Sequence, residues 1–60
     1  MKINNLIRVR FIDRYGDEFT IDGILIDWQK DGLTILTSHN KFIFSILMED
    51  ITLIKVLDYK

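Results

Sequence analysis

The chain has 60 residues, a net charge of −1 and 48% hydrophobic residues, with no cysteine and a single histidine. These features exclude disulfides, thiolate zinc sites and sites built from several histidines, so we expect neither a metal nor another cofactor. A domain of this size buries only about 60% of the surface that its unfolded chain exposes, which makes it marginally stable. Association with another chain is the remaining way to add stability.

Residues 6–12 alternate between apolar and polar side chains, which is typical of a half-buried strand. The turn that follows contains Gly16, the residue best suited to a positive φ. A second strand is predicted to start at Glu18. One antiparallel register gives three favourable cross-strand pairs, which are Phe11–Phe19, Val9–Ile21 and Arg8–Asp22.

Gly23 lies inside the second strand, where a glycine often marks a bulge or a sharp bend. The alternation ends after it, because Ile24, Leu25, Ile26 and Trp28 place apolar groups on both faces. This pattern predicts a long, bent strand that contributes to both halves of a barrel.

Residues 33–37 and 42–46 are predicted to form a second hairpin around a two-residue loop at His39-Asn40, since asparagine tolerates left-handed geometry. His39 is interpreted as an exposed turn residue. The implied pairs are Thr37–Phe42, Ile35–Phe44 and Leu33–Ile46 on one face, and Leu36–Ile43 and Thr34–Ser45 on the other.

Residues 47–50 are too few for a helix between strands and predict a single 3₁₀ turn, and residues 51–57 predict a fifth strand. The apolar residues of 43–57 also fit helical spacing, so a C-terminal helix on a three-stranded sheet is the alternative. The abundance of Ile, Phe, Thr and Val and the absence of alanine favour strands.

These elements predict an all-β fold in which residues 1–60 form one domain: a five-stranded, strongly bent antiparallel barrel of the SH3-like type. Within that group, Val9-Arg10-Phe11, Gly16 and Gly23-Ile24-Leu25 resemble the first motif of the Sm-like family, and residues 51–57 resemble its last strand. The resemblance implies ring formation through edge-strand pairing.

The RNA-binding positions of the Sm-like family do not carry over to this chain. Gln29 and Leu33 stand where the first motif has its aspartate and asparagine, and Met48-Glu49-Asp50 replaces the basic pair of the second motif. The resemblance therefore implies a fold and a habit of assembly, without a set of RNA contacts.

The predicted outer face holds more apolar residues than a solvated surface needs, and contiguous exposed apolar area usually marks an interface. Trp28 could anchor a partner there, and its alternative role is to cap the open end of the barrel. The predicted partner or oligomer interface consists of Leu6, Ile12, Ile24, Ile26, Trp28, Leu36 and Ile43.

We therefore expect a non-catalytic binding and assembly module that forms a homo-oligomer or binds another protein. The chain shows no nucleophile–base pair and no glycine-rich phosphate loop, so we do not expect an enzyme. Its N-terminus lacks the apolar stretch of a signal peptide, and no apolar run approaches the roughly 18 residues of a membrane span. These absences predict a cytoplasmic protein without a membrane partner.

Two alternatives remain open from the sequence. The first is an Sm-like nucleic-acid binder, although mixed charges argue against it. Its contacts to phosphates or bases would come from Arg8, Arg10, Arg14, Tyr15, Lys30 and Lys41. The second is a phage or mobile-element protein that inhibits a host factor, since a chain rich in Ile, Lys, Asn and Asp without Ala or Pro is typical of AT-rich bacterial or phage DNA.

Overall fold

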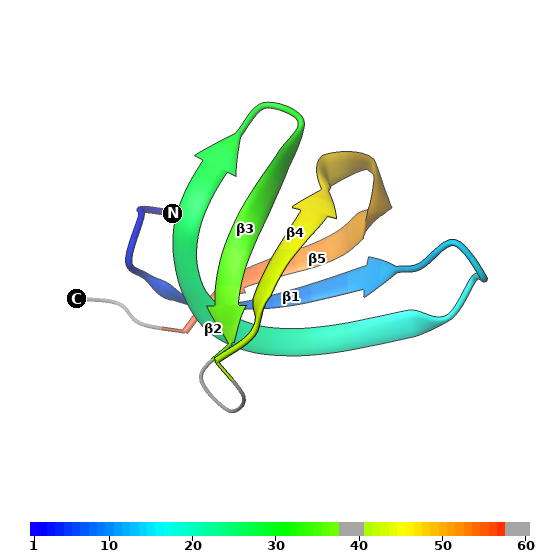
Figure 1. Ribbon diagram of the computed structural model, residues 1–60, viewed down its shortest axis with the longest axis horizontal. Coiled ribbons are helices and arrows are strands. Elements are labelled where there is room, and N and C mark those ends of the chain that lie inside the picture. The colour runs from blue at the N-terminus through cyan, green and yellow to red at the C-terminus, as the bar shows by residue number, and fades with distance from the viewer. Residues whose placement is uncertain (38–40, 58–60) are drawn as a thin grey trace.

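The computed structural model of the chain describes residues 1–37 and 41–57, which form one five-stranded antiparallel sheet (Figure 1). The strands lie in the order β4-β3-β2-β1-β5. The predicted all-β class is confirmed, and the alternative C-terminal helix is wrong because residues 43–56 form two strands around a 3₁₀ turn. The elements are β1 (Leu6–Ile12), β2 (Glu18–Gln29), β3 (Gly32–Thr37), β4 (Ile43–Leu47), the 3₁₀ turn η1 (Met48–Asp50) and β5 (Ile51–Val56).

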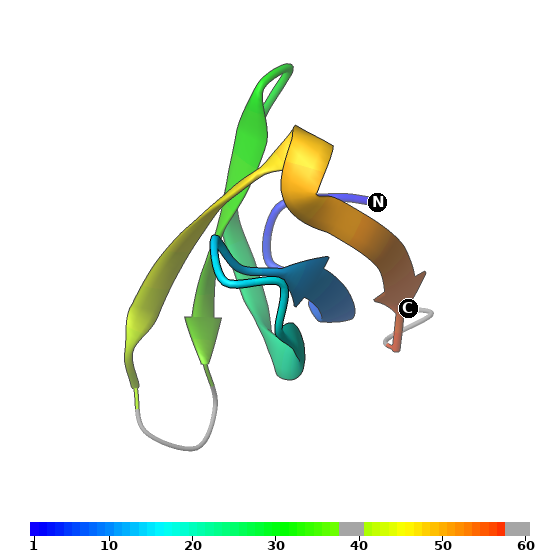
Figure 2. The same cartoon turned by 90° about the vertical axis from the view of Figure 1, so that its right-hand side faces the viewer.

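The sheet is strongly bent, but it is not closed into the predicted barrel. β4 and β5 are its two edges, and η1 joins them. Figure 2 shows the two strands leaving η1 in different directions, so they diverge along their length. Closure would need ladder hydrogen bonds between these edges, and the described residues of the two strands form none, since β4 pairs with β3 and β5 pairs with β1.

The predicted registers are confirmed at both hairpins. The β1–β2 ladder contains every predicted pair, and the phenyl rings of Phe11 and Phe19 lie 5.8 Å apart. In the β3–β4 hairpin, the Thr37 N–H donates to the Phe42 carbonyl at 2.8 Å. The predicted loop at His39-Asn40 lies outside the described residues. The remaining β3–β4 pairs are Leu33–Ile46, Thr34–Ser45, Ile35–Phe44 and Leu36–Ile43.

Gly23 lies within β2, a strand that curves strongly along its length (Figure 1). The register shift expected near it falls later, between Leu25 and Asp27. Gly23 is needed for a different reason, which is the close approach of β3. A Cβ atom at this position would meet the Ile35 side chain and lie 2.5 Å from the Leu36 carbonyl oxygen. The glycine therefore allows the two strands to pack, and the bulge itself is at Ile26.

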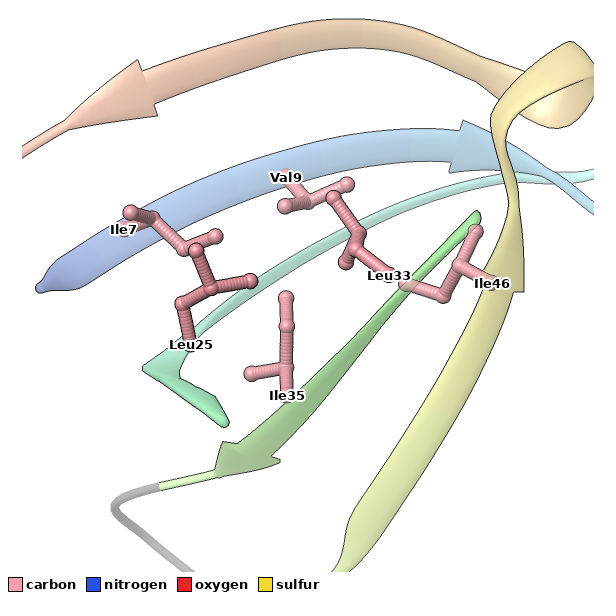
Figure 3. Packing of buried hydrophobic residues seen from close by; sticks show 6 residues of the cluster. All are labelled: Ile7, Val9, Leu25, Leu33, Ile35 and Ile46. Atoms are coloured by element: carbon pink, nitrogen blue, oxygen red, sulfur yellow. The ribbon is translucent and has the colours of Figure 1, made fainter. Parts of the chain in front are cut away.

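The core consists of aliphatic side chains that converge from β1, β2, β3 and β4 (Figure 3). Because the sheet is open, other side chains at core-facing positions stay partly exposed. Phe42 on the approach to β4 is 58% exposed, and Phe44 on β4 is 39% exposed. The buried hydrophobic residues are Ile7, Val9, Leu25, Leu33, Ile35 and Ile46.

The N-terminal segment docks on the bend of β2, which the sequence pattern does not predict. The Asn4 N–H donates to the Leu25 carbonyl at 2.7 Å, and the Leu25 N–H donates to the Asn5 carbonyl at 2.9 Å. Asn4 adopts a φ of 77° to make this turn, and Met1 packs against the core. The segment thus satisfies backbone groups of β2 beside the bulge.

Candidate interaction surface

Four aliphatic residues form one continuous row across the outer face of the sheet. Leu6 on β1 pairs with Ile24 on β2. Ile24 also pairs with Leu36 on β3, and Leu36 pairs with Ile43 on β4. We call Leu6, Ile24, Leu36 and Ile43 the outer aliphatic row.

The outer aliphatic row lies on the face opposite the core. Its sequence neighbours Ile7, Leu25 and Ile35 have no exposed surface, and successive strand residues point to opposite faces. Three members of the row are partly exposed, and Ile43 at the β4 edge is 66% exposed. An apolar strip that crosses four strands is suited to contact another protein surface.

The other predicted interface residues lie apart from this row. Ile12 ends β1, where it pairs with Glu18. Ile26 occupies the β2 bulge and is 38% exposed. Trp28 pairs with the core residue Leu33 near the β2–β3 turn, yet it remains 48% exposed, so it lies on the core-facing side rather than in the outer row.

Leu47 is an exposed apolar residue that the sequence pattern does not single out. It ends β4, pairs with Gly32 and is 55% exposed. The sequence-based prediction ends this strand at residue 46 and assigns Leu47 to the turn. The signal that could have found it is the alternation of Ile43, Ser45 and Leu47, which continues one residue beyond the predicted end.

The two arginines of β1 are paired with carboxylates. The Arg8 guanidinium donates to both oxygens of Asp22, at 2.9 Å and 3.0 Å, as the sequence predicts. Arg10 lies 3.8 Å from the Glu18 carboxylate. Both carboxylates reduce the positive charge that this face presents to a phosphate.

The other candidate nucleic-acid contacts lie on three different connections. Arg14 and Tyr15 are in the β1–β2 turn, where Tyr15 is 80% exposed. Lys30 lies in the β2–β3 turn, and Lys41 precedes β4 with a φ of 55°. Figure 1 shows the β1–β2 turn and the β2–β3 turn at well-separated points of the sheet. These candidate side chains therefore do not line up as one basic track for a nucleic-acid backbone.

A shallow pocket of about 270 Å³ is lined by the end of β2, the start of β3 and the end of β4. The hydroxyl oxygens of Thr34 and Ser45 are 3.2 Å apart there, and the Gln29 amide donates to Asp27 at 3.2 Å. Within residues 1–37 and 41–57, no cluster of three or more potential ligand side chains is placed to hold a metal ion. The same residues contain no helix with the length and apolar character needed to cross a membrane.

Replacing Asp22 with asparagine should produce a small stability loss that depends on pH. Hydrogen bonding from Arg8 lowers the pKa of the Asp22 carboxyl below its ordinary value of 3.8, and the same hydrogen bond raises the pKa of Arg8. A carboxyl whose pKa is lower in the folded state stabilises the fold at pH values above its unfolded-state pKa. This contribution is lost as the pH falls through the folded-state pKa.

Because the two side chains are 44% and 38% exposed, the effect is modest. Near neutral pH we expect Asp22→Asn to lower the melting temperature by roughly 1–5 °C. The difference should vanish at acid pH, where the carboxyl is protonated in both states. A difference that stays constant between about pH 7 and about pH 2 would contradict the ionic origin of the effect.

The outer aliphatic row is thus the feature with the strongest potential for binding. Comparison of the chain with protein-family models, with curated proteins and with solved structures finds no match.

Proposed function

We propose that this chain is a non-catalytic assembly module that self-associates through a strand edge and the outer aliphatic row. The observation that carries the proposal is the unbroken pairing of Leu6, Ile24, Leu36 and Ile43 across four strands, on the face opposite the core. Strands of a sheet with one solvated face normally place polar residues on that face. An apolar row on this face therefore favours contact with a partner.

The size of the domain supports the same conclusion. Removing apolar surface from water contributes roughly 25 cal/mol per Å², and this chain has few buried side chains of its own. Burying the outer aliphatic row against a second copy would add apolar contacts that the isolated domain lacks. The Sm-like resemblance, which implies assembly through strand edges, agrees with this proposal.

Replacing Ile43 with lysine should weaken self-association by about 10- to 100-fold, because it puts a charge in the most exposed part of the row. The high exposure of Ile43 means that the monomer fold should remain, which a circular dichroism melt would check. Light scattering after size exclusion would measure the change in mass.

Tyr15→Lys is the matched control, since Tyr15 is also highly exposed but lies in the β1–β2 turn, away from the row. It should leave the mass distribution unchanged. Equal masses for wild type, Ile43→Lys and Tyr15→Lys would contradict a role of the outer aliphatic row in self-association.

A further inference from the structure

β4 is an edge strand without the usual protection against pairing. Residues 42–47 carry no charged side chain, and within residues 1–37 and 41–57 β4 is bonded on one side only, to β3. Natural edge strands are usually protected by charges, bulges or prolines. The opposite edge, β5, has such features: Lys55 lies within it, and its ladder with β1 shifts register near Phe11. The unprotected edge is therefore β4.

The backbone groups that β4 presents to its open side follow from its pairing with β3. The Phe42 carbonyl accepts from Thr37 of β3, and hydrogen-bonding direction alternates along an antiparallel ladder. Phe44 and Ile46 therefore direct their N–H and C=O groups to β3. Ile43, Ser45 and Leu47 direct theirs to the open edge, where another strand could bond to all of them.

We infer that the open edge of β4 pairs antiparallel with β4 of a second copy, about a two-fold axis at Ser45. This inference rests on the proposed self-association and names its interface. With Ser45 opposite itself, Ile43 lies opposite Leu47, and every outward N–H and C=O of the strand gains a partner. A shift of two residues in either direction leaves one end of the strand unpaired.

The side chains fit this register on both faces. Ile43 and Leu47 are 66% and 55% exposed, and pairing brings them together across the interface. On the core-facing side, the partly exposed Phe44 meets Ile46 of the second copy. The outer aliphatic row, which ends at Ile43, then continues into the second copy. Edge pairing covers the Ile43 end of the row, and Leu6, Ile24 and Leu36 stay on the outer face, where a further contact between copies can bury them.

The charges that flank β4 favour the antiparallel arrangement. Lys41 and Glu49 are both exposed. Lys41 lies just before the strand and Glu49 in η1 just after it, so antiparallel pairing brings the basic end of each β4 near the acidic end of the other. The head-to-tail alternative, β4 against β5, would place this uncharged edge against the edge that a bulge and Lys55 protect.

A cysteine at the axis tests the register directly, because the chain contains no other cysteine. Paired residues at this type of position have Cα atoms about 5.5 Å apart, and their side chains lie slightly beyond the reach of a direct disulfide. A short bis-maleimide crosslinker should therefore join Ser45→Cys into a covalent dimer. Leu53→Cys, also exposed but on β5, is the control and should crosslink at least tenfold more slowly.

Charge reversal provides a second measurement. Lys41→Glu should weaken the dimer by about tenfold at low salt, because it leaves only acidic side chains at both ends of the paired strands. The double variant Lys41→Glu/Glu49→Lys should restore wild-type affinity. Two results would overturn β4 pairing but leave the proposed self-association standing. One is a dimer that crosslinks through Leu53→Cys and not through Ser45→Cys, and the other is a double variant that fails to restore the affinity. A wild-type chain that stays monomeric would overturn both.

Discussion

Replacing Leu25 with alanine should lower the free energy of unfolding by about 3 kcal/mol, because Leu25 has no exposed surface and lies among the aliphatic core residues (Figure 3). The loss combines the transfer energy of the removed methine and two methyl groups with the cost of the cavity left behind. A domain of this size has little stability in reserve, so we expect a largely unfolded protein at 37 °C.

Leu53→Ala is the matched control, since it removes the same atoms from a side chain that is 44% exposed. Its cost should stay below about 1 kcal/mol. Urea unfolding followed by Trp28 fluorescence would measure both variants. Similar losses for the two leucines would mean that the core is not centred on the bend of β2.

Replacing Gly23 with alanine should destabilise the fold by about 3 kcal/mol, although alanine usually favours an extended strand over glycine. The reason is steric. The new Cβ would lie 2.5 Å from the Leu36 carbonyl oxygen and 2.9 Å from its carbon, and backbone atoms cannot move aside without separating β2 from β3.

Gly16→Ala isolates the steric effect, because Gly16 has a φ of 83° but a Cβ added there would have no neighbouring atom within 4 Å. It should cost about 1 kcal/mol through backbone strain alone. If thermal melts gave the larger loss for Gly16→Ala, the close approach of β3 to Gly23 would be contradicted.

The sequence pattern predicts the strands and registers well where local signals agree with each other. The β1–β2 register follows from alternation, from the Phe11–Phe19 pair and from the Arg8–Asp22 charges, all of which select one alignment. In the turn between these strands, the Asp13 carboxylate accepts from the backbone N–H groups of Tyr15 and Asp17, a role in which aspartate is common.

Features that depend on long-range geometry could not be predicted in this way. Whether β4 meets β5 depends on how far the sheet curls, which no short segment encodes. The bulge at Ile26 has no distinctive residue, and the glycine expected to mark it serves close packing instead. The docking of Asn4 and Asn5 on Leu25 joins segments whose sequences show no mutual signal.

The candidate surface is predictable only in part for the same reasons. Alternation and strand pairing place Leu6, Ile24, Leu36 and Ile43 on the outer face, and the structure joins them into one row. The sequence pattern groups Trp28 with them because it does not reveal the bulge. The extra residue at Ile26 moves Trp28 to the core-facing side, opposite Leu33.

Sedimentation velocity of the wild-type chain over a range of micromolar concentrations tests self-association most directly. We expect the weight-average mass to rise with concentration from the chain mass of 7.1 kDa towards twice that value. A mass of 7.1 kDa at every concentration would contradict self-association.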